Sequence, residues 1–190
     1  MEPPAIHAPI RGAQDSIRST GGLHSLGSFK LVQIALEMVS DLAVNGFAHD
    51  VAVADVVQHL VPLLTLKPPS PDSAAPFRRL TLLTLDAITK LILGDREFPG
   101  SKSYSRRTTI SKVISLMKDD KNIFKAALRT LAALATDPRN FRYFLQDRFV
   151  DALNQSLCDP DPSLVSQAIE IIAAVPEDGK SRPTLIYACY

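Results

Sequence analysis

The sequence has little of what nucleic-acid-binding proteins usually require. Tryptophan is absent, aromatic residues make up 6% of the chain, and Lys+Arg 21 against Asp+Glu 20 leaves a net charge of +1. Proteins that coat nucleic acid usually carry a strong basic excess, and those that hold single strands stack bases on aromatic side chains. The composition therefore argues against nucleic-acid binding, which is kept only as the less favoured alternative.

Cysteine and long hydrophobic runs are also scarce. Cys158 and Cys189 are the only cysteines in 190 residues, too few for a disulfide scaffold, and we interpret both as reduced thiols. No run of about 20 apolar residues is present to span a membrane, and the N-terminus lacks the apolar core of a secretory signal. We therefore expect a cytoplasmic or nuclear protein that does not insert into a membrane.

The patterns of catalytic and cofactor sites are missing as well. The histidines have no metal-ligand spacing; they are His7, His24, His49 and His59. No glycine-rich phosphate loop or nucleophile elbow occurs. Asp159, next to Cys158, disfavours a nucleophilic thiolate at that position. The sequence predicts no enzyme activity, no metal and no cofactor.

The chain does contain a helical phrase that recurs four times, at Ala35–Ala43, Thr84–Ile92, Ala127–Ala135 and Ala168–Pro176. The second positions of these phrases are separated by 49, 43 and 41 residues; they are Leu36, Leu85, Leu128 and Ile169. A period in this range is typical of stacked helical repeats. Such arrays usually act as binding surfaces, because each unit contacts only its neighbours and the stack leaves an extended face.

Hydrophobic spacing of three and four residues predicts helices along most of the chain. They are expected at about 14–19, 29–45, 51–66, 77–93, 108–118, 123–135, 138–145, 149–157 and 164–174. Asn45-Gly46 should end a helix, Pro62 should kink or break one, and 67–76 and 95–105 should be loops. Since strand alternation is absent, the sequence predicts an all-α protein.

With the helices placed in this way, the chain resembles the armadillo repeat family, whose unit has two shorter helices and a long third helix. Residues 137–175 give the clearest match, 104–135 and 47–93 each resemble a second-and-third-helix pair, and 14–45 resembles a truncated first unit. The resemblance implies a right-handed α-solenoid of about three to four repeats. The expected organisation is a flexible segment 1–13, a repeat domain 14–176 with units at 14–46, 47–94, 95–136 and 137–176, and a tail 177–190.

The resemblance implies a concave surface made by the third helices, which binds another protein. The chain would then be an adaptor or assembly factor, or a subunit of a larger complex; the alternative is a regulator of a chaperone or enzyme, such as an Hsp70 nucleotide-exchange factor. The candidate contact residues are Glu37, Asp41, Asp86, Lys90, Arg129 and Glu170. Family members that grip extended basic peptides use a ladder of Asn side chains, and the equivalent positions here are Asp41, Lys90, Ala133 and Ala174. This departure argues against binding of the nuclear-import type.

A basic segment rich in serine and threonine is a further candidate site. Lys102, Arg106, Arg107 and Lys112 form its cluster of cations. Three interpretations are open: a solvated loop, a contact with an acidic partner, and phosphorylation of Thr109, where a helix N-terminus would favour the phosphate charge.

Aromatic residues gather in one short region, at Phe141, Tyr143, Phe144 and Phe149. Packing between repeats is the favoured interpretation, because such units bury their faces against neighbours. The other interpretation is an anchor at a protein interface.

Overall fold

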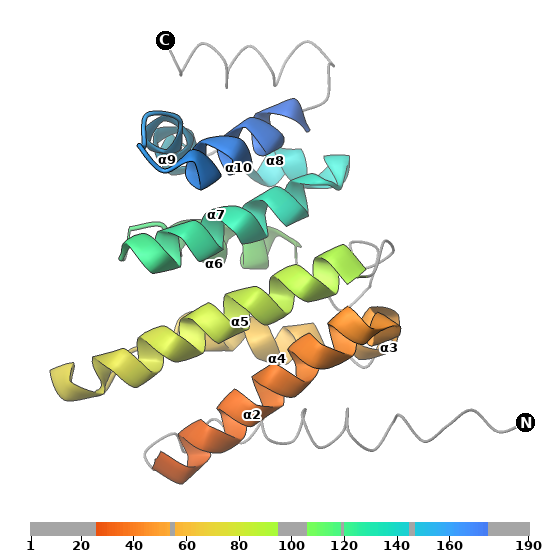
Figure 1. The fold of residues 1–190 in the computed structure, drawn as a ribbon, viewed down its shortest axis with the longest axis vertical. Helices are drawn as coiled ribbons and strands as arrows, with labels where there is room; N and C mark the ends of the chain where they lie inside the picture. Colours follow the sequence, from red (N-terminus) through yellow and green to blue (C-terminus); the bar gives the residue numbers. More distant parts are fainter. Residues whose placement is uncertain (1–25, 54–55, 95–105, 119, 145–146, 175–190) are drawn as a thin grey trace, which may run out of the picture. The chain divides into compact units, whose positions relative to one another are not determined.

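The computed structural model describes residues 26–53, 56–94, 106–118, 120–144 and 147–174 (Figure 1). Over these residues the chain is built of helices and connecting turns without strands, so the all-α prediction is confirmed. The expected segment 1–13, helix 14–19, loop 95–105 and tail 177–190 lie outside the described residues, and the repeat bounds remain predictions. The chain divides into two compact units, unit 1 (Met1–Tyr104) and unit 2 (Ser105–Tyr190), which are described separately.

Unit 1 is organised around two long helices, α2 (Leu26–Leu42) and α5 (Ala74–Gly94). Between them in the chain come a π-helical turn, η2 (Ala43–Phe47), and the helices α3 (Ala48–Val53) and α4 (Val56–Leu63), followed by the 3₁₀ turn η3 (Pro71–Ser73). α2 packs along α5, and α3 and α4 pack on α5 as well. Figure 1 shows α2 and α5 running in the same direction, so that their N-terminal ends lie on the same side of the unit.

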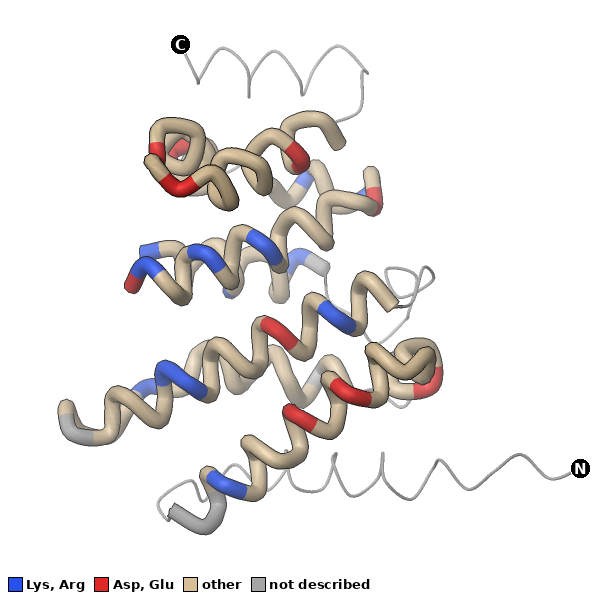
Figure 2. The backbone as a smooth tube through the Cα atoms, viewed as in Figure 1, with Lys and Arg blue, Asp and Glu red and all other residues tan. Residues whose placement is uncertain are grey.

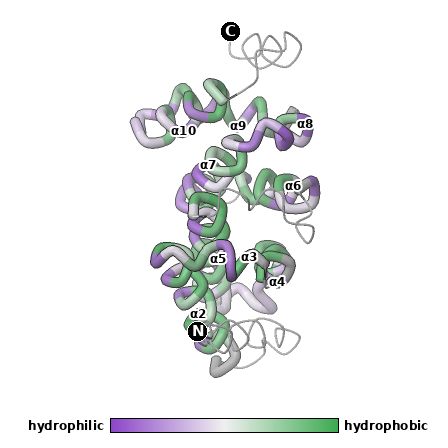
Figure 3. Tube along the Cα trace, turned by 90° about the vertical axis from the view of Figure 1, so that its right-hand side faces the viewer, coloured by the Kyte–Doolittle hydropathy of each residue, from purple (hydrophilic) through white to green (hydrophobic). Residues whose placement is uncertain are grey.

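The core of unit 1 follows the helical spacing of the sequence. On α2 the buried residues include Val32, Leu36 and Val39, and on α5 they include Leu85 and Ile88. Spacing of three and four residues puts each set on one stripe of its helix, and the two stripes are removed from water together. Figure 3, which colours each residue by its hydropathy, shows hydrophobic and hydrophilic residues alternating along the helices.

The connections in unit 1 differ in part from the predictions. Gly46 has φ 91°, a left-handed conformation that favours glycine, and it interrupts the helix where Asn45-Gly46 was expected to do so. The predicted helix 51–66 is two helices, α3 and α4, and Pro62 lies near the end of α4, which stops at the next residue. The loop was predicted to end at Pro76, but α5 begins at Ala74. Pro76 fits in the first turn of α5 because the N–H groups of a first turn have no partner within the helix.

One stretch in the described part of the chain, Phe29–Val51, is long and apolar enough to cross a membrane by length and composition alone, with a mean hydropathy of 1.3. It carries charges at Lys30, Glu37, Asp41 and Asp50 and is interrupted at Gly46. Its α2 portion packs along α5 and buries an apolar stripe there. These features are those of a core helix of a folded domain.

Unit 2 contains α6 (Arg106–Leu116), α7 (Lys121–Ala135), the 3₁₀ turn η5 (Pro138–Asn140), α8 (Phe141–Phe144), α9 (Asp147–Leu157) and α10 (Pro162–Ala173). α7 packs against α6 and α10, α10 packs against α9, and α6 packs against α8. Leu128 and Leu131 of α7 and Leu164, Ala168 and Ile171 of α10 are buried. The long helices α7 and α10 therefore form the centre of this unit.

Aspartates begin three of the helical segments of unit 2. The Asp120 carboxylate accepts hydrogen bonds from the backbone N–H groups of Asn122 (2.8 Å) and Ile123 (3.0 Å) at the start of α7. Asp137 caps η5 and Asp161 caps α10 in the same way. An N-cap acceptor satisfies N–H groups that have no partner within the helix. At Asp137 the cap is followed by Pro138, which suits a first helical position because it has no N–H to satisfy.

Hydroxyl side chains inside the repeated phrases are buried and hydrogen-bonded. Thr84, Thr89 and Thr130 donate to the backbone carbonyls of Leu80, Leu85 and Ala126, four residues earlier, at 2.8, 2.8 and 2.9 Å. A buried hydroxyl is tolerated when it makes such a bond. Threonine can therefore occupy phrase positions that face the core.

The aromatic cluster of unit 2 is mostly internal. Phe141 is 5% exposed, whereas Phe144 and Phe149 are fully buried. The ring centroid of Phe144 lies 5.8 Å from that of Phe141 and 5.1 Å from that of Phe149. Tyr143 is half-buried, with the Arg142 guanidinium 4.7 Å from its ring centroid. The packing interpretation is confirmed for the three phenylalanines.

Candidate functional site

The best-defined candidate site is the solvent-facing side of α2 and α5 in unit 1, which we call the unit 1 face. α2 contributes the exposed residues Lys30, Glu37 and Asp41 and the half-buried Gln33, and η2 contributes the exposed Val44. α5 contributes the exposed Arg79 and the half-buried Leu83, Asp86 and Lys90. Because the opposite stripes of both helices are buried, the backbone that presents these side chains is held by the core of the unit.

Three of the predicted contact residues on this face interact with neighbours inside unit 1. Lys90 Nζ lies 2.7 Å from Asp86 Oδ2, in an ion pair within α5. The Ser40 hydroxyl donates to the same Asp86 oxygen at 3.5 Å, linking α2 to α5. The Gln33 side-chain amide donates to Glu37 Oε1 at 2.9 Å. Asp86 and Lys90 are therefore only partly exposed, at 37% and 33% of their side-chain surface, and pair with each other.

Charge on the unit 1 face is ordered along the two helices. Each helix carries a cation in its N-terminal half and a carboxylate seven residues later, Lys30 and Glu37 on α2 and Arg79 and Asp86 on α5. Seven residues are nearly two full turns, so the two charges of each helix share one side and are about 10 Å apart along the axis. Figure 2 shows the cations near the N-terminal ends of α2 and α5 and the carboxylates further along both helices.

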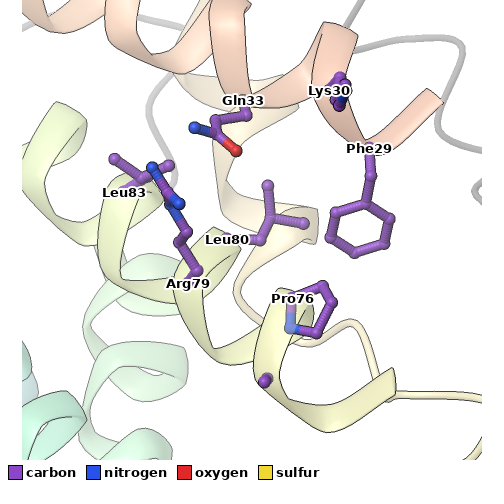
Figure 4. Close-up of a pocket in the computed structure, with 8 residues that line it drawn as sticks. Phe29, Lys30, Gln33, Pro76, Arg79, Leu80 and Leu83 are labelled. Atoms are coloured by element: carbon purple, nitrogen blue, oxygen red, sulfur yellow. The ribbon is translucent and has the colours of Figure 1, made fainter. Parts of the chain in front are cut away.

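An open cavity of about 400 Å³ lies at the cationic end of this face. It is lined from α2 by Phe29, Lys30 and Gln33 and from α5 by Ala75, Pro76, Arg79, Leu80 and Leu83 (Figure 4). The Phe29 ring packs edge-on against Phe77, with centroids 4.7 Å apart. A cavity of this size, mostly apolar with a few polar groups, has the composition of a ligand pocket.

In unit 2, Arg129 on α7 and Glu170 on α10 are exposed. The Ser166 hydroxyl donates to Glu170 Oε1 at 3.5 Å. Other cations of α7 pair with the turn before α10: Lys121 Nζ lies 3.3 Å from Asp159 Oδ1, and Lys125 pairs with Asp161. These two ion pairs of unit 2 therefore help to hold α10 against α7.

These contacts give a pH-dependence prediction for Asp161. A hydrogen bond from Lys125, together with bonds from the Ser163 side chain and backbone N–H, holds the pKa of Asp161 well below its usual range. Because the folded-state pKa is lower than the unfolded value of about 3.9, the stabilisation is complete above that pH and is lost as the pH falls further. The urea midpoint of Asp161→Asn should therefore fall less than that of the wild-type protein between about pH 5 and pH 2.

Asp151→Asn is the matched control, because Asp151 is an exposed carboxylate on α9. Urea unfolding followed by circular dichroism across this pH range makes the comparison. A midpoint for Asp161→Asn that tracks the wild-type and Asp151→Asn curves at every pH would contradict the prediction.

The basic segment is only partly described. Arg107 is exposed, whereas Lys102 and the side chain of Arg106 lie outside the described residues. Thr109 is 1% exposed, so its hydroxyl is buried in this fold, which argues against phosphorylation of Thr109. Thr109 is the fourth residue of α6 and faces the core with Ile110 and Val113.

Several residues of the candidate site were not singled out from the sequence: Phe29, Lys30, Gln33, Arg79 and Leu83. The recurrence of a cation followed seven residues later by a carboxylate on two equivalent helices is the signal that could have found Lys30 and Arg79. Within the described segments, no group of three His, Cys, Asp or Glu residues could hold a metal ion. Cys158 is a free, exposed thiol directly after α9.

Comparison with known proteins identifies the fold. No protein-family model matches the sequence, and no curated protein matches it. A designed armadillo repeat protein, solved in complex with the peptide (KR)4, superimposes with a TM-score of 0.70 at 18% identity, over 93% of this chain and 68% of the other. Two engineered proteins superimpose with TM-scores of 0.67 and 0.63 at 18% and 17% identity. This chain is covered over 92% and 95% of its length, and it spans 66% and 46% of theirs. The chain therefore has an all-α, armadillo-like helical-repeat fold.

Proposed function

We propose that the protein is a non-enzymatic interaction module that acts as an adaptor or assembly factor, binding a partner protein through the exposed sides of its long helices. The observation that carries the proposal is the unit 1 face, where ordered charges and an apolar cavity lie on helices fixed by a buried core. Rigid presentation lowers the entropic cost of binding, because little has to be ordered when the partner arrives. We also propose a cytoplasmic or nuclear location.

The similar designed protein binds a basic peptide, (KR)4. The unit 1 face has acceptors for cations in Glu37 and Asp41, but it also carries Lys30 and Arg79 at one end. A uniformly basic peptide would meet those cations and be repelled. A partner segment of mixed charge therefore fits this face better than a purely basic one.

The test is affinity capture of the tagged full chain from a cell lysate, with mass spectrometry, beside a Lys90→Glu/Arg129→Glu variant. A partner that binds the long-helix faces should be recovered with wild-type protein and lost, by about tenfold or more, with the variant, because reversing charges at an interface adds like-charge repulsion. Circular dichroism of the variant checks that the fold survives the replacement of Lys90, which is paired with Asp86.

Arg107→Glu/Lys118→Glu is the matched control, since it reverses two exposed cations on and just after α6. The control should retain the partner. Equal recovery of every specific partner by wild type, variant and control would remove the proposed binding faces. A partner lost in the α6 control alone would place the interaction elsewhere in unit 2.

A further inference from the structure

We propose that the cavity between α2 and α5 anchors an acidic peptide segment of a partner protein. A large apolar side chain of the peptide fills the cavity, and carboxylates beside it bind Lys30 and Arg79. This inference rests on the proposed function and specifies the chemistry of the segment that the unit 1 face binds.

The cavity has the size and lining for one apolar anchor. Its volume of about 400 Å³ is bounded by the apolar side chains of Phe29, Pro76, Leu80 and Leu83 (Figure 4). Leu80 is buried at the base, whereas Leu83 and Phe29 are half-buried and would lose further exposure on binding. Interface energy is concentrated where a side chain fills such a pocket and excludes water.

The two cations at the cavity are available for a ligand. Lys30 projects from α2 and Arg79 from α5, and neither has a carboxylate partner among the described side chains. By contrast, Lys90, Lys121, Lys125 and Arg139 each pair with an aspartate. A peptide carboxylate at this position would gain a charge-assisted hydrogen bond, and the planar guanidinium of Arg79 suits bidentate binding.

Gln33, which lies between the cations and the acidic part of the face, offers the peptide a further contact. Its amide nitrogen donates to Glu37, which leaves its carbonyl oxygen to accept a hydrogen bond. A backbone N–H of the bound peptide is the matching donor. One such bond at the wall of the cavity would orient the peptide without requiring a particular side chain.

The charge order then sets the direction and composition of the peptide. Glu37 and Asp86 lie seven residues beyond Lys30 and Arg79, about 10 Å along the helices, which an extended peptide covers in about three residues. A suitable segment has acidic residues next to its apolar anchor and a basic residue about three positions away. A polyanion such as RNA would continue over Glu37 and Asp41 and be repelled, and the net charge of +1 gives it no wider attraction.

Selection from a random peptide library displayed on phage, with the purified full chain as bait, tests the composition directly. The expected enrichment is an apolar residue flanked by Asp or Glu, with Lys or Arg about three positions away. Enrichment of uniformly basic peptides, of peptides without acidic residues, or of no peptide over an empty-bait control would overturn the inference.

Fluorescence anisotropy with the most enriched peptide then locates the site. Lys30→Glu/Arg79→Glu should weaken binding by about tenfold or more, and Ala75→Trp, which fills the cavity from an exposed position, should do the same. Arg107→Glu/Lys118→Glu, the same charge change on and just after α6, should bind as wild type. Unchanged binding in both cavity variants would overturn the inference.

The outcomes separate this inference from the proposed function. If a partner captured from lysate is lost with Lys90→Glu/Arg129→Glu but kept by both cavity variants, the interaction module stands and the cavity is not its anchor. If no partner depends on either set of residues, both proposals fail. A labelled single-stranded RNA of random sequence that binds in place of the peptide, and is displaced by salt, would also contradict the acidic-peptide assignment.

Discussion

Replacing Leu36 with alanine is expected to lower the free energy of unfolding by about 2–5 kcal/mol, the range for truncating a fully buried leucine. Leu36 is the second position of the first repeated phrase, and its side chain is fully buried in the helix that packs along α5. Removing its methyl groups would leave a cavity that α2 and α5 can close only in part. This loss is a large fraction of the total free energy of unfolding, which is about 5–15 kcal/mol for small domains.

Leu31→Ala is the matched control, because it makes the same chemical change on the same helix at a side chain that is 57% exposed. Its effect should be within about 0.5 kcal/mol. Urea unfolding followed by circular dichroism measures both variants, and hydrogen exchange shows whether the amides of α2 and α5 lose protection. Equal destabilisation by the two variants would mean that the assignment of core and surface on α2 is wrong.

The contrast between Leu36 and Leu31 shows both the value and the limit of helical spacing. The second positions of the first three phrases, Leu36, Leu85 and Leu128, are all fully buried. Leu31 and Ile34, which three- and four-residue spacing puts on one apolar face with Ala35, are 57% and 58% exposed, so that spacing predicted the α2 core only in part. The fourth, Ile169, is 53% exposed, although Ala168 beside it is fully buried. α10 packs on α7 and α9, and its buried residues are Leu164, Ala168 and Ile171. The second position of a phrase therefore does not face the core in every repeat.

Helix ends were predicted less well than helix positions. The sequence indicated a helix starting at Thr108, but α6 begins at Arg106. Thr109 is buried because it lies on the same side of α6 as Ile110 and Val113. The α5 start at Ala74 similarly puts Pro76 within the helix and on the wall of the cavity. Local sequence gives helix ends poorly, because fraying, capping and packing all move them by a residue or two.

The cavity could not be predicted from sequence, for a different reason. Its two walls are Phe29–Gln33 and Ala75–Leu83, segments far apart in the chain that meet only because α2 and α5 pack side by side. The ion pair of Asp86 with Lys90 joins residues four apart on one helix, but both were predicted as contacts for a partner and not as a pair. Features between helices required the packed structure.

Phe144→Ala is expected to destabilise unit 2 by about 3–5 kcal/mol, the range for removing a buried aromatic ring. Phe144 is fully buried and lies between the rings of Phe141 and Phe149, at centroid distances of 5.8 and 5.1 Å. Its removal would take away both ring contacts and leave a cavity beside the short helix α8, which has only four residues to hold it in place. Helices this short depend on tertiary packing and not on their own hydrogen bonds.

Phe144→Leu separates the cavity from the loss of the ring contacts, since leucine fills much of the space but cannot reproduce those contacts. We expect a loss of about 0.5–1.5 kcal/mol from the missing aromatic pairs, well below that of alanine. Urea unfolding of both variants gives the comparison, and hydrogen exchange in 138–144 reports whether α8 opens locally. If Phe144→Ala left both the unfolding midpoint and the protection of α8 unchanged, the aromatic residues would not be the core of this repeat. Their alternative role as an interface anchor would then be the better explanation of the cluster.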